Sequence, residues 1–264
     1  MSGIIQDLIS DILLCLPVKS LVRYRCLSKS SRTEIDSETF INAHLTRSIE
    51  TKTRRRLILE RVVRLNKCTV VGLDELEQGR LVVQDGQNFH DRSIRGSCNG
   101  LVLLEHHDHH GRRRFPFSLW NPFTKRIKEL AVFNPQDPFY GITHLGFGYD
   151  RGSNDYKLVG IRGHYRFSDI WFFSLVSNSW KKLQITCPKK IRDCTSNGIF
   201  AHGALHWRTY GNHGYEIVSF DMSKQEFLPV LEIKPQIISS NARVHAKLVM
   251  PGHNVGLGPN RRWG

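Results

Sequence analysis

The segment GSCNG, from Gly96 to Gly100, has the spacing of a catalytic nucleophile turn. Cys98 holds the middle position, where a reactive serine or cysteine stands in such turns. A nucleophile turn must lead from a strand into a helix, but here the strand-like run LVLLE follows. Asn-Gly is also a common pair in hairpin turns. We therefore expect a turn between two strands and no nucleophile.

A second candidate is the histidine-rich stretch HHDHH at 106–110, because tracts of this kind can bind zinc or nickel. Gly111 and three arginines at 112–114 follow it directly. This composition indicates a hairpin loop, and the cationic neighbours oppose metal binding. We expect a loop without a metal site, and no bound cofactor.

Tryptophans could form a stacking platform for carbohydrate or bases. The candidates are Trp120, Trp171, Trp180 and Trp207. All four fall at or near strand positions, where aromatic residues usually fill the core between sheets. A platform would need several of them exposed on one face, so we expect core packing. A phosphate-binding glycine loop and paired carboxylates in catalytic context are also missing from the sequence. We expect a non-catalytic protein.

The formal net charge of +14 would attract phosphate backbones, anionic lipid or acidic proteins. The excess is spread out, with its densest runs at 52–56, 112–114 and 189–190. It also lacks the interleaved aromatic residues of a single-strand binding groove. We expect solvated loops or attraction to an acidic protein partner, with nucleic acid bound only weakly and without sequence preference.

The N-terminal segment lacks the layout of a secretory signal, since it has no early basic residue and Asp7 and Asp11 interrupt its apolar stretch. Elsewhere no apolar run reaches the roughly 20 residues that span a bilayer. The six cysteines are scattered, without a C-x-x-C pair, so free thiols are expected. We expect an intracellular protein of the nucleus or cytoplasm without a membrane partner.

Apolar residues near the N-terminus recur every three or four positions. They are Ile5, Leu8, Ile9, Ile12, Leu13 and Leu16. This spacing places them on one stripe of a helix. Pro17 ends that helix and suits the start of a second one, whose apolar face begins with Val18, Leu21 and Val22.

Two more short helices are expected within the first 45 or so residues, capped by Ser28 and Ser37. The first carries Ile35, and the second carries Phe40 and Leu45. So small a bundle encloses little core, and domains below about 70 to 80 residues usually need a staple or a partner. With neither a disulfide nor a metal expected, the sequence favours a partner.

The same helices resemble the F-box of the large plant F-box family. That family's pattern of Leu-Pro, a leucine-rich turn and Cys-(Val/Leu)-Ser-Lys is matched by LPVKSLVRYRCLSK at 16–29. The resemblance implies docking to the Skp-type adaptor of a cullin-based ubiquitin ligase. The residues that it implies form or support the adaptor interface are Leu8, Ile9, Ile12, Leu13, Leu16, Pro17, Leu21, Val22, Cys26, Leu27 and Ser28. The family commonly has a tryptophan shortly after the Ser-Lys pair, where this chain has Ser30 and Ser31.

From about residue 57 the pattern changes to short apolar runs separated by turn residues, which is typical of sandwich or propeller-like sheets. Three segments also resemble one another: SLWNPFTKRIKEL, FSLVSNSWKKL and SFDMSKQEFLPV. Each predicts a strand, a polar turn and a second strand opened by Ile127, Trp180 or Phe227. Their spacing of about 50 residues is that of kelch-type blades. We expect three blades and a candidate fourth at 57–104. Closed propellers have about four to eight blades, so this count leaves both a complete and an incomplete ring open.

A second resemblance covers this region. GSCNGLVLL, LWNPFTKRIKEL, GFGYDRGSNDYKLVGI, SLVSNSWKKL and GALHW resemble the F-box-associated domain of the same family. That domain is similar to kelch propellers, and the resemblance implies that it holds a target protein. The expected fold class is α+β multidomain, with a small helical F-box and an all-β propeller-like domain. The expected division is 1–46 F-box, 47–56 basic linker, 57–233 β domain and 234–264 irregular tail.

Two functions from different classes stay open. One is the substrate-recognition subunit of a Skp-cullin-F-box E3 ubiquitin ligase, which would bind a target for ubiquitination and degradation. The other is a basic β-propeller-like module that binds nucleic acid or glycan. The helical motif separates them, because it has no purpose in the second. We therefore expect the first, with a Skp-type adaptor, through it a cullin scaffold, and a target protein as partners. The substrate-binding residues are left unassigned.

Overall fold

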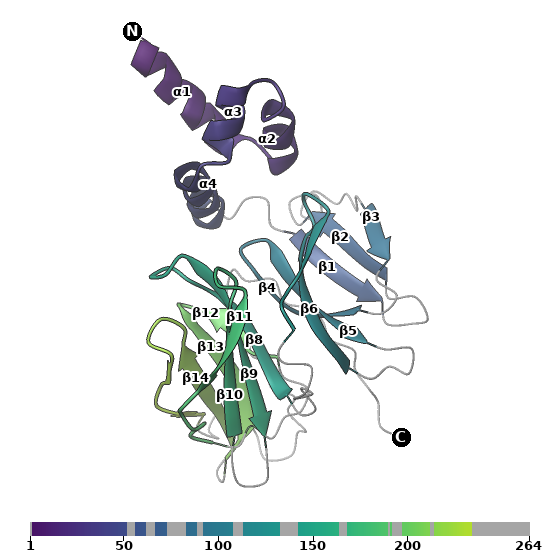
Figure 1. Cartoon of the computed structure of the whole chain (residues 1–264), viewed down its shortest axis with the longest axis vertical. Helices are drawn as coiled ribbons and strands as arrows, with labels where there is room; N and C mark the ends of the chain where they lie inside the picture. The colour runs from purple at the N-terminus through teal and green to yellow at the C-terminus, as the bar shows by residue number, and fades with distance from the viewer. Residues whose placement is uncertain are drawn as a thin grey trace.

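The computed structural model shows a helical part at one end of the molecule and β-sheets at the other (Figure 1). It describes residues 2–51, 56–61, 67–72, 83–88, 92–107, 113–132, 142–163, 168–189, 191, 197–211 and 214–233. Within these ranges, none of the helices has the length and hydrophobicity needed to cross a bilayer. The predicted tail at 234–264 lies outside the described residues.

The helical part follows the predicted order. It comprises α1 (Ser2–Cys15), α2 (Val18–Tyr24), α3 (Lys29–Ile35) and α4 (Glu38–Glu50). Pro17 separates α1 from α2, with the φ of −61° that its ring requires. The predicted caps are confirmed, since the hydroxyls of Ser28 and Ser37 accept the backbone N–H of Ser31 and Phe40 at 3.0 and 3.2 Å. The helix boundaries in the helical part are therefore determined by proline and serine residues that can be read directly from the sequence.

The cap at Ser37 should stabilise the helical part measurably, because it fixes the start of the helix that carries the core residue Phe40. Ser37→Ala should lower the free energy of unfolding by about 1 kcal/mol, measured by urea denaturation followed by circular dichroism. Ser37→Thr keeps a hydroxyl at the same place and should stay close to wild type. An equal loss in both variants would contradict a capping role.

The described strands lie in four sheets, all of whose neighbouring strands are antiparallel. The strands are β1 (Arg56–Arg61), β2 (Lys67–Gly72), β3 (Val83–Asn88), β4 (Arg92–Cys98), β5 (Leu101–His107), β6 (Arg113–Asn121), β7 (Arg126–Glu129), β8 (Ile142–Asp150), β9 (Asp155–Gly163), β10 (Ser168–Ser174), β11 (Ser179–Leu183), β12 (Ile199–Ala201), β13 (Ala204–Tyr210), β14 (Tyr215–Asp221), β15 (Glu226–Phe227) and β16 (Leu231–Glu232). The sheet orders are β1-β2-β3, β4-β5-β6-β7, β11-β10-β9-β8 and β12-β13-β14-β15, with β16 paired to β14. Sheets in which each strand pairs with the next have the layout of propeller blades.

The three predicted repeats take equivalent positions in three blades. Ile127, Trp180 and Phe227 are the second residues of β7, β11 and β15, and they pair across the hairpin with Trp120, Phe173 and Phe220 respectively. The last turn residue before the second strand is Lys125 in the first repeat, Asn178 in the second and Gln225 in the third. All three have positive φ. The repeat that the sequence predicted from side-chain types is thus also a repeat of backbone geometry.

Two predicted boundaries differ from the structure. α4 continues to Glu50, past the expected end of the helical domain at residue 46. The candidate fourth blade at 57–104 is wrong in its extent, because β4 and β5 pair with β6 rather than with β1–β3. The pairing follows from the Asn99-Gly100 turn, whose positive φ values of 49° and 80° fold β5 back onto β4 and toward the next hairpin.

β8 connects three blades, since it contacts β4 of the preceding sheet and β12 and β13 of the following one. Gly146 of β8 forms a bridge with Gly198, whose N–H donates to the Leu145 carbonyl at 2.7 Å. A Cβ on Gly198 would lie 2.6 Å from the ring of Trp207. Glycine is therefore required where adjacent blades meet through their backbones.

The Asp150 carboxylate ties the β8–β9 turn to the next blade. Its Oδ2 accepts hydrogen bonds from Lys157 Nζ at 2.5 Å and Ser153 Oγ at 2.6 Å. Ser223, in the β14–β15 turn, donates its hydroxyl to Oδ1. Burial acts to raise the pKa of Asp150, but the hydrogen bonds from Lys157 and the two serines outweigh it and hold that pKa below its ordinary value. The fold therefore favours the ionised carboxylate.

Asp150→Asn should lower the free energy of unfolding by about 3 kcal/mol at neutral pH, because it leaves the buried ammonium of Lys157 without its counter-charge. Since the folded pKa lies below the unfolded one, this stabilisation is present above about pH 4 and is lost as the pH falls toward the folded pKa. Denaturant unfolding of both proteins across this range measures the difference. The double variant Asp150→Asn/Lys157→Met should recover part of the loss, and a double variant as unstable as the single one would contradict the account.

Candidate adaptor interface

The apolar side of α1 consists of two neighbouring stripes with different exposure. Ile9 and Leu13, continued by Leu16 just after the helix ends, form the inner stripe; Leu13 is only 2% exposed, and the other two pack against the helical core. Leu8 and Ile12 form the outer stripe and are 57% and 59% exposed. The bundle thus buries only part of an apolar band that is wider than its own core requires. The outer stripe is left available to a partner.

The core under this surface is small but ordered by specific contacts. Its buried residues are Leu13, Leu21, Ile35 and Phe40. His44 Nε2 lies 3.0 Å from the Leu16 carbonyl, which ties α4 to the end of α1. Arg25 donates twice to the Asp36 carboxylate at 2.6 Å, and this hydrogen bonding lowers the pKa of Asp36. These contacts hold the exposed positions in place.

α2 and the turn after it carry the rest of the predicted interface. Leu21 is buried in the core, whereas Val22 is 43% and Leu27 is 74% exposed. Pro17, Cys26 and Ser28 are exposed as well. Of the eleven predicted residues, the structure therefore presents seven at the surface and places Ile9, Leu13, Leu16 and Leu21 beneath them as support. Four of the exposed ones are apolar side chains on α1, α2 or the following turn: Leu8, Ile12, Val22 and Leu27.

The segment GSCNG ends β4 and turns at Asn99 and Gly100 into β5, so the predicted turn between two strands is confirmed. Cys98 is 6% exposed, and its burial raises the pKa of the thiol to about 12. A buried thiol with so high a pKa is a poor nucleophile at neutral pH. The predicted absence of a nucleophile turn is explained by the strand that follows Gly100.

Ser118, His106 and Glu129 have the residue types of a catalytic triad and lie within contact distance. His106 Nε2 lies 3.1 Å from Ser118 Oγ and 3.3 Å from Glu129 Oε2. In a working triad the serine and the carboxylate contact opposite nitrogens of the imidazole, whereas here both contact the same one. Arg92 also donates to Ser118 and Glu129, at 3.3 and 3.1 Å. The four side chains form a polar row across the sheet rather than a catalytic site.

Two other sequence candidates can be placed in part. His106 belongs to this polar row, while His109 and His110 lie outside the described residues. Trp120 and Trp207 are 2% and 0% exposed, so their predicted core packing is confirmed. Trp171 and Trp180 are half-buried, and Trp180 donates its indole N–H to the Ala131 carbonyl at 3.0 Å. The four tryptophans therefore do not form an open stacking platform.

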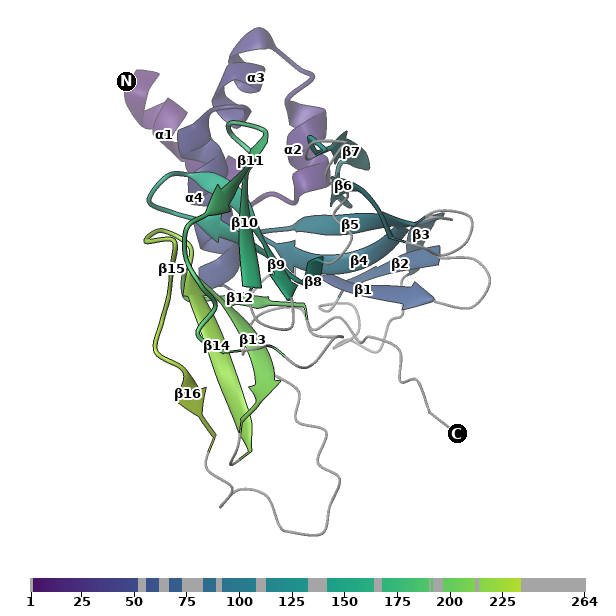
Figure 2. The same ribbon diagram turned by 60° about the horizontal axis from the view of Figure 1, so that its bottom comes forward.

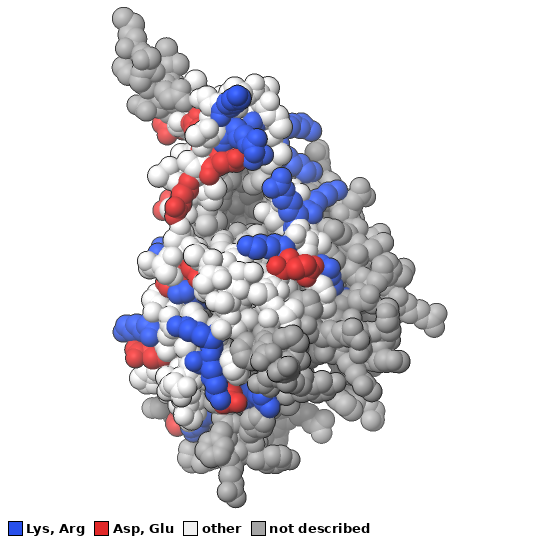
Figure 3. All heavy atoms as spheres, in the orientation of Figure 1, with Lys and Arg blue, Asp and Glu red and all other residues white. Residues whose placement is uncertain are grey.

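A basic surface that Figure 3 shows differs from the runs that the sequence singled out. Those runs lie mostly outside the described side chains, and Lys189 pairs with Glu216 at 2.9 Å. Figure 3 shows lysine and arginine atoms gathered where the helices meet the β domain. The exposed basic side chains of α2, the first residue of α3 and the β6–β7 hairpin are Lys19, Arg23, Lys29, Lys125, Arg126 and Lys128. No single run of the sequence contains them, because they come from two domains.

Comparisons with known proteins match both parts of this architecture. The model of the F-box domain matches residues 2–42, and the model of the F-box associated beta propeller domain matches residues 68–249. F-box protein CPR1 from Arabidopsis thaliana is 29% identical over 254 residues, which cover 86% of this chain and 59% of the relative. An F-box/kelch-repeat protein of the same plant is 27% identical over 237 residues, covering 84% of this chain and 63% of the relative. Among solved structures, TolB from Acinetobacter baumannii has a TM-score of 0.40 at 8% identity over 65% of this chain and 39% of TolB, too weak a likeness to carry weight.

The structure thus joins a small helical bundle, which has an exposed apolar band, to a set of blade-like sheets. The chain belongs to the plant family of F-box proteins with an F-box-associated β-propeller domain. F-box domains in general bind Skp1-type adaptors, and F-box proteins are in general non-catalytic. The chain spans about six tenths of the length of the two relatives described above, 59% and 63%.

Proposed function

We propose that the chain is the substrate-recognition subunit of a Skp-cullin-F-box E3 ubiquitin ligase. The observation that carries this proposal is the outer apolar stripe of the F-box helices, Leu8 and Ile12, which are more than half exposed although the bundle has a core beside them. Burying a leucine or isoleucine fully is worth about 1.5 to 3 kcal/mol, so a partner that covers both gains appreciable affinity. A Skp-type adaptor is the partner that the family assignment supports.

The adaptor contacts divide by exposure. Leu8, Ile12, Pro17, Val22, Cys26, Leu27 and Ser28 form the contact surface. Ile9, Leu13, Leu16 and Leu21 hold the helices that present it. A cullin scaffold joins through the adaptor, and the F-box chain itself supplies no catalytic group to ubiquitin transfer.

The β domain holds the target protein for ubiquitination and degradation. We keep the predicted division of the chain as a proposal: 1–46, 47–56, 57–233 and 234–264. Its first boundary moves to Glu50, where α4 ends. The aromatic residues do not favour a role as a nucleic-acid or glycan module. Among the described residues, Tyr210 is the one large aromatic side chain that is exposed. Stacking platforms use several such rings on one face.

Reconstitution tests this proposal. The purified chain and a Skp-type adaptor, mixed and passed through a gel-filtration column, should elute as one complex that a cullin can join. Proteins captured by this complex in plant extract should become ubiquitinated when the remaining ligase components and ATP are added. A chain that stays separate from the adaptor at concentrations well above a micromolar would contradict the proposal.

A further inference from the structure

The surface between the helices and the β domain carries a surplus of positive charge that the fold itself does not use. α2 contributes Lys19 and Arg23, the start of α3 contributes Lys29, and the β6–β7 hairpin contributes Lys125, Arg126 and Lys128. All six side chains are exposed, and within the described ranges none of them forms an ion pair. These six residues are called the junction surface below.

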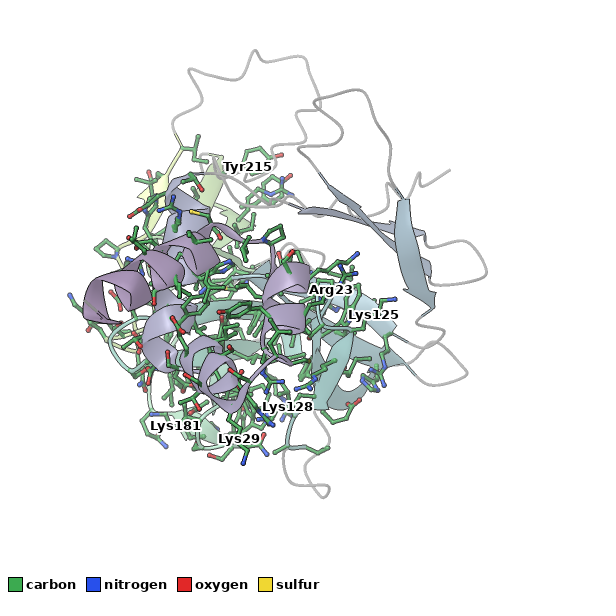
Figure 4. The ribbon with its side chains drawn as sticks, turned by 90° about the horizontal axis from the view of Figure 1, so that it is seen from above. Arg23, Lys29, Lys125, Lys128, Lys181 and Tyr215 are labelled. Carbon is green, nitrogen blue, oxygen red and sulfur yellow. The ribbon has the colours of Figure 1, made fainter. Side chains whose placement is uncertain are left out.

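The two domains meet closely enough to share this surface. α2 and the β6–β7 hairpin lie side by side in the views of Figures 1, 2 and 4. Seen from above, Arg23, Lys125, Lys128 and Lys29 follow one another along one margin of the helical end, with Lys181 further along (Figure 4). Cations from both domains therefore face the same side.

The carboxylates of the same elements are already engaged. α2 contains none. Asp36, after α3, is bound by Arg25 and Arg32, and Glu129 of β7 is bound by Arg92. Glu34 accepts the hydroxyl of Ser10. Like charges so gathered repel one another unless an anionic surface covers them.

Protection of sheet edges accounts for only part of this charge. Lysines on outer strands discourage pairing with other chains, and β7 and β11 are both outer strands that carry them. That reason does not apply to Lys19, Arg23 and Lys29, which lie on helices. The helical half of the junction surface needs another explanation.

The position of Arg23 connects the junction surface to the adaptor interface. Arg23 lies between Val22 and Leu27, and the backbone stays in helical turns through this stretch, with Leu27 N–H donating to the Tyr24 carbonyl at 3.0 Å. A partner that covers the two apolar side chains must also lie against the guanidinium. Burying an unpaired charge is costly, so that partner must offer carboxylates here.

We propose that the β6–β7 hairpin is a second contact for the adaptor, and that an acidic surface of the adaptor extends from α2 across the junction surface to Lys125 and Lys128. This inference rests on the proposed function, since it assumes that the adaptor docks on the F-box helices. It gives the β domain a part in adaptor binding in addition to holding a target. The charges steer association and fix the orientation of the adaptor relative to the β domain.

The test measures association of the full chain with an immobilised, purified Skp-type adaptor. Lys125→Gln/Lys128→Gln removes two charges from the hairpin without touching the helices. Lys182→Gln/Lys224→Gln removes two exposed charges that already have a carboxylate partner, Asp169 at 2.7 Å and Glu226 at 3.9 Å. Lys182 lies on β11, and Lys224 lies in the turn before β15, on the side of the molecule away from β7 in Figure 2. The hairpin variant should associate about tenfold more slowly at low salt, and the control less than about twofold. At about 1 M salt, where charges are screened within about 3 Å, the two variants should match wild type.

Each other outcome is decisive. If both variants change the rate equally, only net charge matters and the second contact is overturned, while the proposed function stands. If the wild-type chain does not bind the adaptor, the proposed function falls and this inference falls with it. The hairpin variant could instead associate with the adaptor at the wild-type rate but no longer bind a labelled poly-glutamate peptide that the wild type binds. That result would assign the surface to an acidic target segment. Retention of a single-stranded RNA oligonucleotide at physiological salt, lost only in the hairpin variant, would assign it to nucleic acid.

Discussion

Replacing Leu8 and Ile12 together by aspartate should abolish adaptor binding and leave the chain folded. Both side chains are more than half exposed, so they contribute little to the bundle's own core. Losing the burial of their exposed parts in the complex costs about 2 to 3 kcal/mol, and two carboxylates placed against an apolar partner surface add to it. The dissociation constant should rise more than about a hundredfold. Titration calorimetry with the purified adaptor measures this change.

Two controls separate the interface from the fold. Val176→Asp/Leu231→Asp makes the same chemical change at apolar positions of the β domain that are 76% and 61% exposed, and adaptor binding should persist. Leu13→Asp/Leu16→Asp should instead unfold the helical part, because Leu13 is buried and Leu16 packs against the core. Circular dichroism distinguishes loss of helix from loss of an interface. Wild-type affinity in Leu8→Asp/Ile12→Asp would mean that the adaptor does not use the outer stripe.

The helical part could be predicted almost completely, because its determinants are local. Proline and serine act on the backbone within a few residues, so Pro17, Ser28 and Ser37 show where helices end and begin. The apolar periodicity located the band on α1 but did not separate its stripes. Ile9 and Leu8 are equally apolar, and only the packing of α4 against α1 decides that Leu8 faces outward. Which apolar residues of a helix stay exposed for a partner therefore depends on tertiary packing and not on the local sequence.

The sequence repeat located one hairpin in each of three blades, where large apolar residues mark the strands, but it did not show how neighbouring blades meet. β10 and β14 are rich in aromatic and branched side chains, whereas β8 contains Gly146 and Gly148. Glycine lowers strand propensity, so a strand pattern is weak there. The glycines are explained only by the neighbouring blade, whose side chains occupy the space of the missing Cβ atoms.

The junction surface escaped prediction for a related reason. Its charges are single residues or short groups in the sequence, far less dense than the run at 52–56, and they gather only when the β6–β7 hairpin lies beside α2. Charge density along a chain predicts solvation, while charge density on a surface depends on topology. The docking motif can therefore be recognised in the sequence, whereas the surplus cations beside it are recognised only in the folded structure.

Gly146→Ala/Gly198→Ala should destabilise the β domain by about 2 to 5 kcal/mol, a large share of the stability of a domain this size. The Cβ on residue 198 would lie 2.6 Å from the Trp207 ring, and that on residue 146 would lie 2.6 Å from a Leu205 methyl. Trp207 and Leu205 are both fully buried, so neither can move aside. The effects should not add fully, since both changes strain the same tryptophan. Guanidinium unfolding followed by tryptophan fluorescence measures the loss.

Gly96→Ala is the matched control, because Gly96 lies on β4, which also packs against β8, and a Cβ there would meet Phe147 at an ordinary 3.5 Å. It should change the free energy of unfolding by less than about 1 kcal/mol. Adding Trp207→Leu to the double glycine variant removes the ring that both new methyl groups approach, although Leu205 still meets the one on residue 146 and space is left in the core. The triple variant should therefore lose less stability than the sum of the glycine and tryptophan changes measured separately. Full additivity would mean that blade contact at β8 does not depend on the missing Cβ atoms.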